Sequence, residues 1–124
     1  MLCLEYLHEH GWVYRDLKPS NVMLDVEGHA HLVDFGLCKR VEKRMRRWST
    51  GGSVEYLSPE VFESGKYDAS VDWWSLGTLI YEMISGLPPF YDKNRRVMYN
   101  KILSAPLSRC PYMSPEISLR CACV

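Results

Sequence analysis

The sequence predicts an α+β fold that is mainly α-helical and carries one short β hairpin. Two short apolar segments, 22–24 and 31–33, flank a turn at 25–28 that ends in glycine, so they are expected to pair as antiparallel strands. Residues 71–84 are apolar nearly all round, which is typical of a helix enclosed by protein. Gly86 follows as the residue expected to end that helix.

Three further helices are expected along the chain. The first covers residues 1–9, with its apolar side chains at Leu2, Leu4, Tyr6 and Leu7. The second lies in 92–104, where apolar residues recur at helical spacing, namely Val97, Met98, Ile102 and Leu103. Its apolar face is expected to pack on the protein, and a docking surface for partners is the less favoured alternative. A third opens at 114–116, where serine, proline and glutamate fit an N-cap, N1 and first-turn acid.

Composition limits the class of protein without naming a partner. A chain of 124 residues forms one domain at most, and its zero formal net charge points to no charged partner. No apolar run has membrane-spanning length and no signal peptide is recognisable, so an intracellular, cytoplasmic protein without a membrane segment is expected, with the nucleus left open. Five scattered cysteines fit reduced thiols better than a disulfide framework.

Chemistry concentrates in residues 13–21 and 33–36. Transfer of a phosphoryl group requires a carboxylate to orient and deprotonate the acceptor hydroxyl, oxygen ligands for a metal on the triphosphate, and a cation for the charge on the transferred group. The two segments supply all of these groups: Asp16 as the base, Lys18 as the cation, and Asn21 and Asp34 as Mg²⁺ ligands. A polar turn beside a buried strand is the plainer alternative, which the density of these residues disfavours.

These residues, in this order, resemble the catalytic-loop and D-F-G sequences of the eukaryotic protein kinases. Residues 58–60, Ser-Pro-Glu, stand where that family has A-P-E. The resemblance implies a catalytic loop at 14–21, an activation segment at 34–60 and helices of the large lobe at 70–124. The glycine-rich loop and strand lysine of the family are not found in the sequence, so the chain is expected to be a large-lobe fragment without the small lobe.

The resemblance implies roles for further residues. Asp72 is expected to hydrogen-bond the backbone of the catalytic loop and so support Arg15 and Asp16, as outer contacts that hold a site in productive geometry do. Ser53 is expected to bond the base and the lysine. Glu60 pairs in the family with an arginine that would lie beyond residue 124, so it is expected to lack that partner. Structural support is also implied for Tyr14, Phe35 and Gly36, and binding of ATP for Lys18, Asn21, Met23 and Asp34.

The acceptor is expected to be serine or threonine, because a lysine two residues after the catalytic aspartate is the pattern of kinases for those hydroxyls. Several positions together resemble the AGC group, the cyclic-nucleotide-dependent kinases and their relatives: Tyr14, Trp48, Ser49, 55–57 and 72–74. The resemblance implies ATP-dependent phosphorylation of protein substrates with Mg²⁺. In basophilic members, acidic residues at the positions of Ser20 and Glu82 attract a substrate arginine. With serine at position 20, two interpretations stay open: a weaker preference for arginine near the acceptor, or a structural role for Glu82.

Residues 39–47 form a run of basic charge that precedes a candidate regulatory site. The run is expected to be mainly a solvated loop, and no nucleic-acid partner is predicted from it. By resemblance, Ser49 occupies the activation-loop phosphosite, where Arg15 and Lys39 could bind a phosphate and order the loop. An upstream basophilic kinase is the expected partner, with modification of Thr50 or of neither residue as the alternatives.

Two alternatives to catalysis remain at this point. The chain could act as a non-catalytic, pseudokinase-like interaction fragment, or be an incomplete gene product. Because half of the phosphate clamp is not in the sequence, the chain by itself is expected to transfer phosphate at a rate near background. The four histidines, at positions 8, 10, 29 and 31, are assigned no chemistry.

Overall fold

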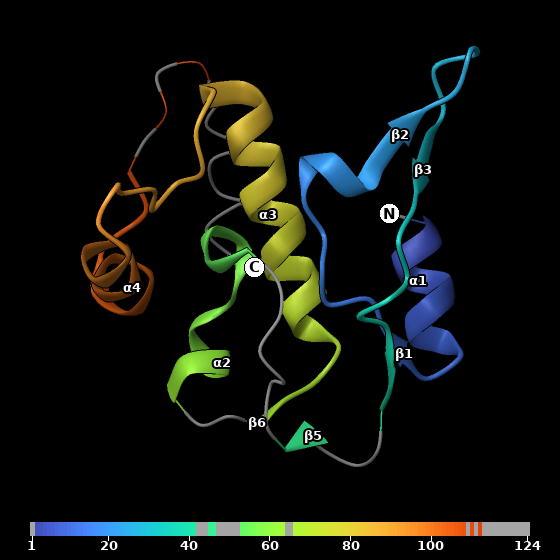
Figure 1. The fold of residues 1–124 in the computed structure, drawn as a ribbon, viewed down its shortest axis with the longest axis horizontal. Helices are drawn as coiled ribbons and strands as arrows, with labels where there is room; N and C mark the ends of the chain where they lie inside the picture. The colour runs from blue at the N-terminus through green and yellow to red at the C-terminus, as the bar shows by residue number, and fades with distance from the viewer. Residues whose placement is uncertain are drawn as a thin grey trace.

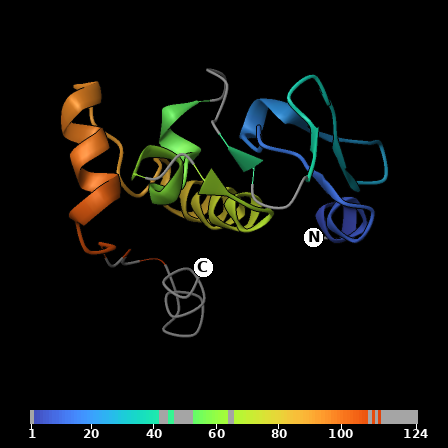
Figure 2. The same cartoon turned by 90° about the horizontal axis from the view of Figure 1, so that it is seen from below.

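One long helix, α3 (Ser70–Ser85), runs through the middle of the molecule (Figure 1). The computed structural model describes residues 2–41, 45–46, 53–63, 66–108, 110 and 112. Helix α1 (Leu2–Glu9) lies on one side of α3, and α2 (Pro59–Glu63) and α4 (Arg95–Ser104) lie on the other, as Figure 2 also shows. Ser49 and the helix expected at residue 114 lie outside the described residues.

The strands of the described part of the chain form three two-stranded antiparallel sheets. β2 (Val22–Leu24) pairs with β3 (Ala30–Leu32), so the predicted hairpin is confirmed, with its second strand one residue earlier than expected. β1 (Trp12–Val13) pairs with β4 (Lys39–Arg40), and β5 (Met45–Arg46) pairs with β6 (Lys66–Tyr67). The description of 39–47 as a solvated loop is therefore wrong in part, because backbone pairing holds two of its segments.

Helix α3 ends as the sequence predicts, although its surroundings differ from the prediction. Gly86 takes a left-handed conformation, with φ of 85°, and its N–H donates to the carbonyl of Glu82. The helix is not enclosed on all sides, since Met83 is 68% exposed. Its buried side instead includes three polar residues, Asp72, Ser75 and Thr78. The Ser75 hydroxyl donates to the Tyr56 carbonyl at 2.8 Å, which shows how such a group is accommodated in the interior.

The flanking helices each bury one face. In α1, Leu4 is buried while Leu2 and Tyr6 are exposed. In α4, Met98 and Ile102 are buried, which confirms the amphipathic helix, although it begins three residues later than the segment expected. Asn94 sets that start by accepting hydrogen bonds from the backbone N–H groups of the first turn. No helix in the described ranges is both long and apolar enough to cross a membrane.

The hydrophobic core that matters for the site joins α1 to α3 through the segment that follows β1. Leu4, Tyr14, Leu17 and Leu79 form this cluster. A second cluster consists of Val13, Tyr67 and Val71, and a third holds α4 through Phe90, Met98 and Ile102. Residues 13–17 are therefore packed against α3 on buried apolar side chains, which fixes the backbone that carries Asp16.

Candidate functional site

Asp16 is the centre of the candidate site. Its Oδ2 accepts one hydrogen bond from Lys18 Nζ at 2.8 Å and another from Asn21 Nδ2 at 2.9 Å. The same Asn21 nitrogen lies 2.9 Å from the Asp16 carbonyl. The short 3₁₀ helix η1 (Pro19–Asn21) makes this contact, because it turns the chain so that Asn21 faces back toward Asp16. The predicted base, cation and carboxamide thus lie together, with Asp16 only 7% exposed.

Asp72 fastens this segment to α3. Its side chain is fully buried, and its two oxygens accept the backbone N–H groups of Tyr14 and Arg15, each at 2.8 Å. The expected hydrogen bonds between Asp72 and the backbone of this segment are present, and the N–H groups of Tyr14 and Arg15 donate them. A buried carboxylate needs such donors, since no water replaces them.

Arg15 has an uncommon backbone conformation, with φ of 71°. Its guanidinium donates from Nε to the Leu37 carbonyl at 2.6 Å and from Nη1 to the Tyr67 hydroxyl at 2.8 Å. Lys39, its predicted companion, lies in β4 opposite Val13. Arg15 thus links the site to the segment after Asp34 and to β6, while the proposed phosphosite Ser49 is outside the described residues.

Asp34 sits at the end of the hairpin and is joined to Asn21 through its neighbour. Val33 N–H donates to the Asn21 carbonyl at 3.0 Å, and the Tyr14 hydroxyl donates to the Val33 carbonyl. Burial raises the pKa of the Tyr14 phenol to about 12, so it stays protonated and able to donate at neutral pH. Asp34 itself is exposed, with φ of 59° and one carboxylate oxygen 3.1 Å from the Gly36 N–H.

Two apolar residues assigned from the sequence flank these groups. Phe35 is 48% exposed and meets the Tyr14 ring edge-on, with ring centroids 5.5 Å apart. Met23 is 56% exposed on β2, opposite His31. Gly36 leaves little room for a side chain, because a Cβ there would lie 3.0 Å from the Asp34 carboxylate. The part of the site around Asp34 is therefore open, and the part around Asp16 is closed.

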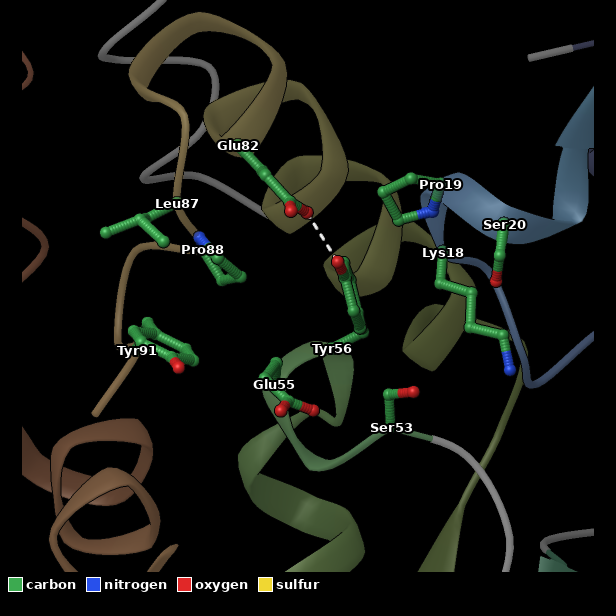
Figure 3. Close-up of a pocket in the computed structure, with 10 residues that line it drawn as sticks. All are labelled: Lys18, Pro19, Ser20, Ser53, Glu55, Tyr56, Glu82, Leu87, Pro88 and Tyr91. Carbon is green, nitrogen blue, oxygen red and sulfur yellow. Dashed lines mark hydrogen bonds between the residues drawn. The ribbon is translucent and has the colours of Figure 1, made fainter. Parts of the chain in front are cut away.

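A cavity of about 410 Å³ lies beside Lys18 and is bordered by acidic and aromatic side chains (Figure 3). Glu82 lines it from α3 and accepts a hydrogen bond from the Tyr56 hydroxyl. Burial and the neighbouring Glu82 raise the pKa of Tyr56 well above its ordinary value. Glu55, which the sequence placed among the positions that resemble the AGC group without a role at the site, lines the same cavity. Glu55 and Tyr56 both belong to the 3₁₀ helix η2 (Val54–Tyr56), and both side chains line the cavity.

Ser53 lies in the wall of this cavity together with Lys18, and in Figure 3 its hydroxyl points toward the side on which Lys18 lies. The hydrogen bonds that the structure describes at the Asp16 carboxylate come from Lys18 and Asn21. The proposed bonds of Ser53 to the base and to the lysine therefore stay a prediction.

Two side chains make contacts that the sequence did not predict. Oε1 of Glu60 lies 3.5 Å from the Ser70 hydroxyl at the start of α3, and the expectation about its family arginine stays a prediction. His8, assigned no chemistry, lies with its Nε2 2.8 Å from Oδ2 of Asp72. No spacing in the sequence connects His8 with Asp72, because they belong to helices that meet only in the folded chain.

Comparison with known proteins agrees with this arrangement. The protein kinase domain family matches residues 1–119. The chain belongs to the protein kinase family. The predicted resemblance to serine/threonine protein kinases is therefore confirmed, and so is a mixed α+β portion of a kinase domain, with helices and small sheets.

Among curated relatives, Protein kinase 2 of Dictyostelium discoideum is 51% identical over 113 residues, which cover 91% of this chain and 24% of the relative. Serine/threonine-protein kinase Sgk1 of Homo sapiens is 51% identical over 109 residues, 87% of the chain and 25% of the relative. Serine/threonine-protein kinase gad8 of Schizosaccharomyces pombe is 54% identical over 108 residues, which cover 86% of the chain and 19% of the relative. The chain thus spans about a quarter or less of the length of these kinases.

Proposed function

We propose that this chain is the part of a serine/threonine protein kinase that orients the acceptor hydroxyl and assists phosphoryl transfer from ATP to a protein. The reaction converts ATP and a serine or threonine hydroxyl into ADP and a phosphoester. The observation that carries the proposal is the buried Asp16 carboxylate, held by Lys18 and Asn21 at 2.8 and 2.9 Å. In this reading, residues 14–21 are the catalytic loop, 34–60 the activation segment and 70–124 belong to the large lobe.

Asp16 is the proposed base. It accepts the proton of the substrate hydroxyl as that oxygen attacks the terminal phosphorus, and the bond from this phosphorus to the bridging oxygen of ADP breaks. Lys18 lies against the same carboxylate and supplies positive charge where negative charge builds on the transferred group. Asn21 donates to the same carboxylate oxygen and helps to hold it in place. Ser53 is proposed to join this set from the cavity wall.

The donor set around Asn21 and Asp34 fits Mg²⁺. Asn21 turns its nitrogen to Asp16, which directs its carboxamide oxygen away from that carboxylate, and Asp34 presents an exposed carboxylate. Carboxamide and carboxylate oxygens are ligands that Mg²⁺ accepts, together with phosphate oxygens of a nucleotide. When bound, Mg²⁺ neutralises charge on the triphosphate. Met23, exposed on β2, is proposed to contact the nucleotide.

The cavity beside Lys18 is proposed to receive a basic residue of the substrate. Glu82 and Glu55 both border it, so two acids are available even though serine stands at position 20. The Tyr56 hydroxyl donates a hydrogen bond to Glu82 and holds it at the wall of the cavity. Glu82 is therefore proposed to have both a structural role and a substrate-binding role. Charge-assisted hydrogen bonds to a guanidinium would give selectivity for arginine near the acceptor.

The test uses the full-length protein with labelled ATP, Mg²⁺ and peptides that carry serine, threonine, tyrosine or alanine at the acceptor position. Turnover on the serine and threonine peptides at roughly 1 per second or more is expected, with Asp16→Asn as the inactive control. Turnover absent from all peptides would overturn the proposal and favour the non-catalytic interaction role.

The cavity is tested with an arginine-containing serine peptide and its alanine counterpart. Glu82→Gln and Glu55→Gln are each expected to raise KM for the arginine peptide about tenfold or more, the effect of losing a charge-assisted hydrogen bond. KM for the alanine peptide should change little. Glu27→Gln, an exposed acid on the hairpin turn, is the matched control. Equal effects on both peptides would contradict recognition of arginine in this cavity.

Ser49 is proposed to be phosphorylated by an upstream basophilic kinase, with the phosphate bound by Arg15 and Lys39. Arg44 and Arg46 stand five and three residues before Ser49, a spacing that suits an acidic substrate pocket. Mass spectrometry of the protein from its own cells is expected to find phosphate at Ser49, and Ser49→Ala is expected to lower activity. Phosphate at Thr50 alone, or full activity of the alanine variant, would remove the proposal.

A further inference from the structure

Three exposed cations gather where α4 begins. Lys93, Arg95 and Arg96 stand within four residues of one another, and all three side chains are exposed. None of them forms an ion pair with a residue in the described part of the chain. Asp92, the acid next to them in sequence, is already engaged, because its carboxylate accepts a hydrogen bond from Lys101 Nζ at 2.9 Å. This basic cluster of Lys93, Arg95 and Arg96 is therefore available to a partner of negative charge.

The two arginines occupy positions that disfavour the helix they begin. Arg95 and Arg96 lie in the first turn of α4, which contains no acidic residue. The helix macrodipole places partial positive charge at that end, so acids stabilise a first turn and arginines do not. A local preference that is broken in this way is expected where the residues serve a purpose other than folding, such as binding.

The basic cluster continues the cavity beside Lys18. Tyr91 lines that cavity at the end away from Lys18 (Figure 3), and Lys93 follows Tyr91 by two residues. Glu82 and Glu55 border the cavity between these two ends. The surface thus changes sign along its length, from acidic inside the cavity to basic just beyond it. An extended segment of matching charge would therefore carry a basic residue followed by acidic ones.

We propose that the basic cluster docks an acidic stretch of the protein substrate, on the far side of the substrate arginine from the acceptor hydroxyl. The inference rests on the proposed function, because this order follows from placing the hydroxyl at Asp16 and the arginine between Glu82 and Glu55. A guanidinium pairs with a carboxylate through two parallel hydrogen bonds, so Arg95 and Arg96 are suited to aspartate or glutamate.

The size of the basic cluster favours a peptide over a membrane or a nucleic acid. Segments that recognise anionic lipids usually carry about 4 to 8 lysines or arginines. Proteins that hold DNA through its backbone make about 6 to 10 phosphate contacts. Three cations fall short of both numbers. Three exposed ion pairs, each worth a factor of about 1.5 to 5 in affinity, fit the moderate gain that selects among peptide substrates.

Binding of labelled peptides to the full-length protein, measured by fluorescence anisotropy, tests the inference without turnover. One peptide carries a serine acceptor, an arginine and, beyond the arginine, three glutamates, and its counterpart carries three glutamines in their place. Each is made with the arginine before or after the serine. In one of these two directions, the glutamate peptide is expected to bind about tenfold more tightly than its counterpart. The difference should shrink towards zero at about 1 M salt, which screens exposed charges.

Two variants separate the charge of the basic cluster from the folding of α4. Lys93→Gln with Arg95→Gln and Arg96→Gln is expected to remove the preference for glutamate and to change binding of the glutamine peptide by less than about twofold. Arg95→Glu with Arg96→Glu is expected to reverse the preference, in favour of a peptide with three lysines at the same place. Acids in the first turn match the helix dipole, so α4 should stay folded in this variant.

A single substitution and its matched control set the scale. Arg96→Gln is expected to weaken binding of the glutamate peptide by a factor of about 2 to 5. Arg40→Gln removes an exposed arginine from β4 and should leave binding as in the wild type. If no peptide were phosphorylated by the wild type, the proposed function would fail, and the anisotropy data would still decide whether the basic cluster binds acids.

Three results would overturn the inference. Equal binding of the glutamate and glutamine peptides by the wild type would show that the basic cluster does not recognise acids. An equal gain from glutamates placed on the opposite side of the serine from the arginine would contradict the proposed order. Binding of phosphatidylserine vesicles that the triple glutamine variant loses, without any preference for glutamate peptides, would assign the cluster to a membrane surface.

Discussion

The two halves of the candidate site differ in how they are held. Asp16 is nearly buried and is surrounded by hydrogen bonds to Lys18 and Asn21, over a segment fastened by the fully buried Asp72. Asp34 is exposed at the end of a hairpin whose turn residue Val26 is fully exposed. This chain therefore holds rigidly the group proposed to act on the substrate hydroxyl and leaves exposed the group proposed to bind metal and nucleotide.

The largest effect should come from removing the two carboxylates one at a time. Asp16→Asn is expected to lower kcat by about 10² to 10⁴, the usual range for a general base, with the affinity for ATP nearly unchanged. Asp34→Asn should instead weaken binding of ATP in the presence of Mg²⁺. Single-turnover kinetics and nucleotide titration of the full-length protein separate the two effects. An unchanged single-turnover rate in Asp16→Asn would show that another group is the base.

Asp72→Ala tests how strongly the closed half is fastened. The substitution leaves two buried backbone N–H groups and His8 without their acceptor, so a loss of about 3 to 5 kcal/mol in the free energy of unfolding is expected. Glu27→Ala on the hairpin turn, where the side chain is 74% exposed, should change stability by less than about 0.5 kcal/mol. Denaturant unfolding measures both, and similar losses would contradict the contrast between the two halves.

Two buried serines, Ser58 and Ser75, differ in whether their hydroxyls are hydrogen-bonded. The hydroxyl of Ser58 has no hydrogen-bond partner among the described residues, whereas that of Ser75 donates to the Tyr56 carbonyl. Ser58→Ala is therefore expected to leave stability unchanged or raise it by about 1 kcal/mol, and Ser75→Ala to lower it by about 1 kcal/mol. A thermal or denaturant melt that shows equal losses for both would indicate that Ser58 is satisfied in solution.

The smallest effect concerns the open half and depends on pH. The hydrogen bond from His31, with further bonds from backbone N–H groups, lowers the pKa of Asp25 from 3.8 to about 2. Because the folded state binds its proton less readily than the unfolded chain, the contribution of Asp25 to stability is complete above about pH 4 and is lost as the pH falls toward 2. NMR titration should place the midpoint near pH 2 in the wild type and closer to the ordinary value in His31→Ala. Equal midpoints would refute the contact.

Local patterns predicted the elements well where they are decided by neighbours in sequence. The hairpin depends on a glycine-containing turn between two short apolar segments, and the end of α3 depends on the left-handed Gly86, so both were accessible from residue types alone. The exposure of Met83 could not be predicted from residue types, because the environment of a helix face depends on what packs against it. Likewise, the run at 39–47 forms strands only because distant segments offer edges for pairing.

Residue types alone indicated the family and the candidate groups of the site: the carboxylates, the lysine and the carboxamide lie within two short segments, and their order is specific enough to indicate a protein kinase. How these groups are supported depends on the packing of the folded chain. The bond of His8 to Asp72 and the entry of Glu55 into the cavity with Glu82 join residues far apart in the chain. Such contacts depend on how helices pack, and a hydrogen bond between two helices leaves no periodic pattern in either of them.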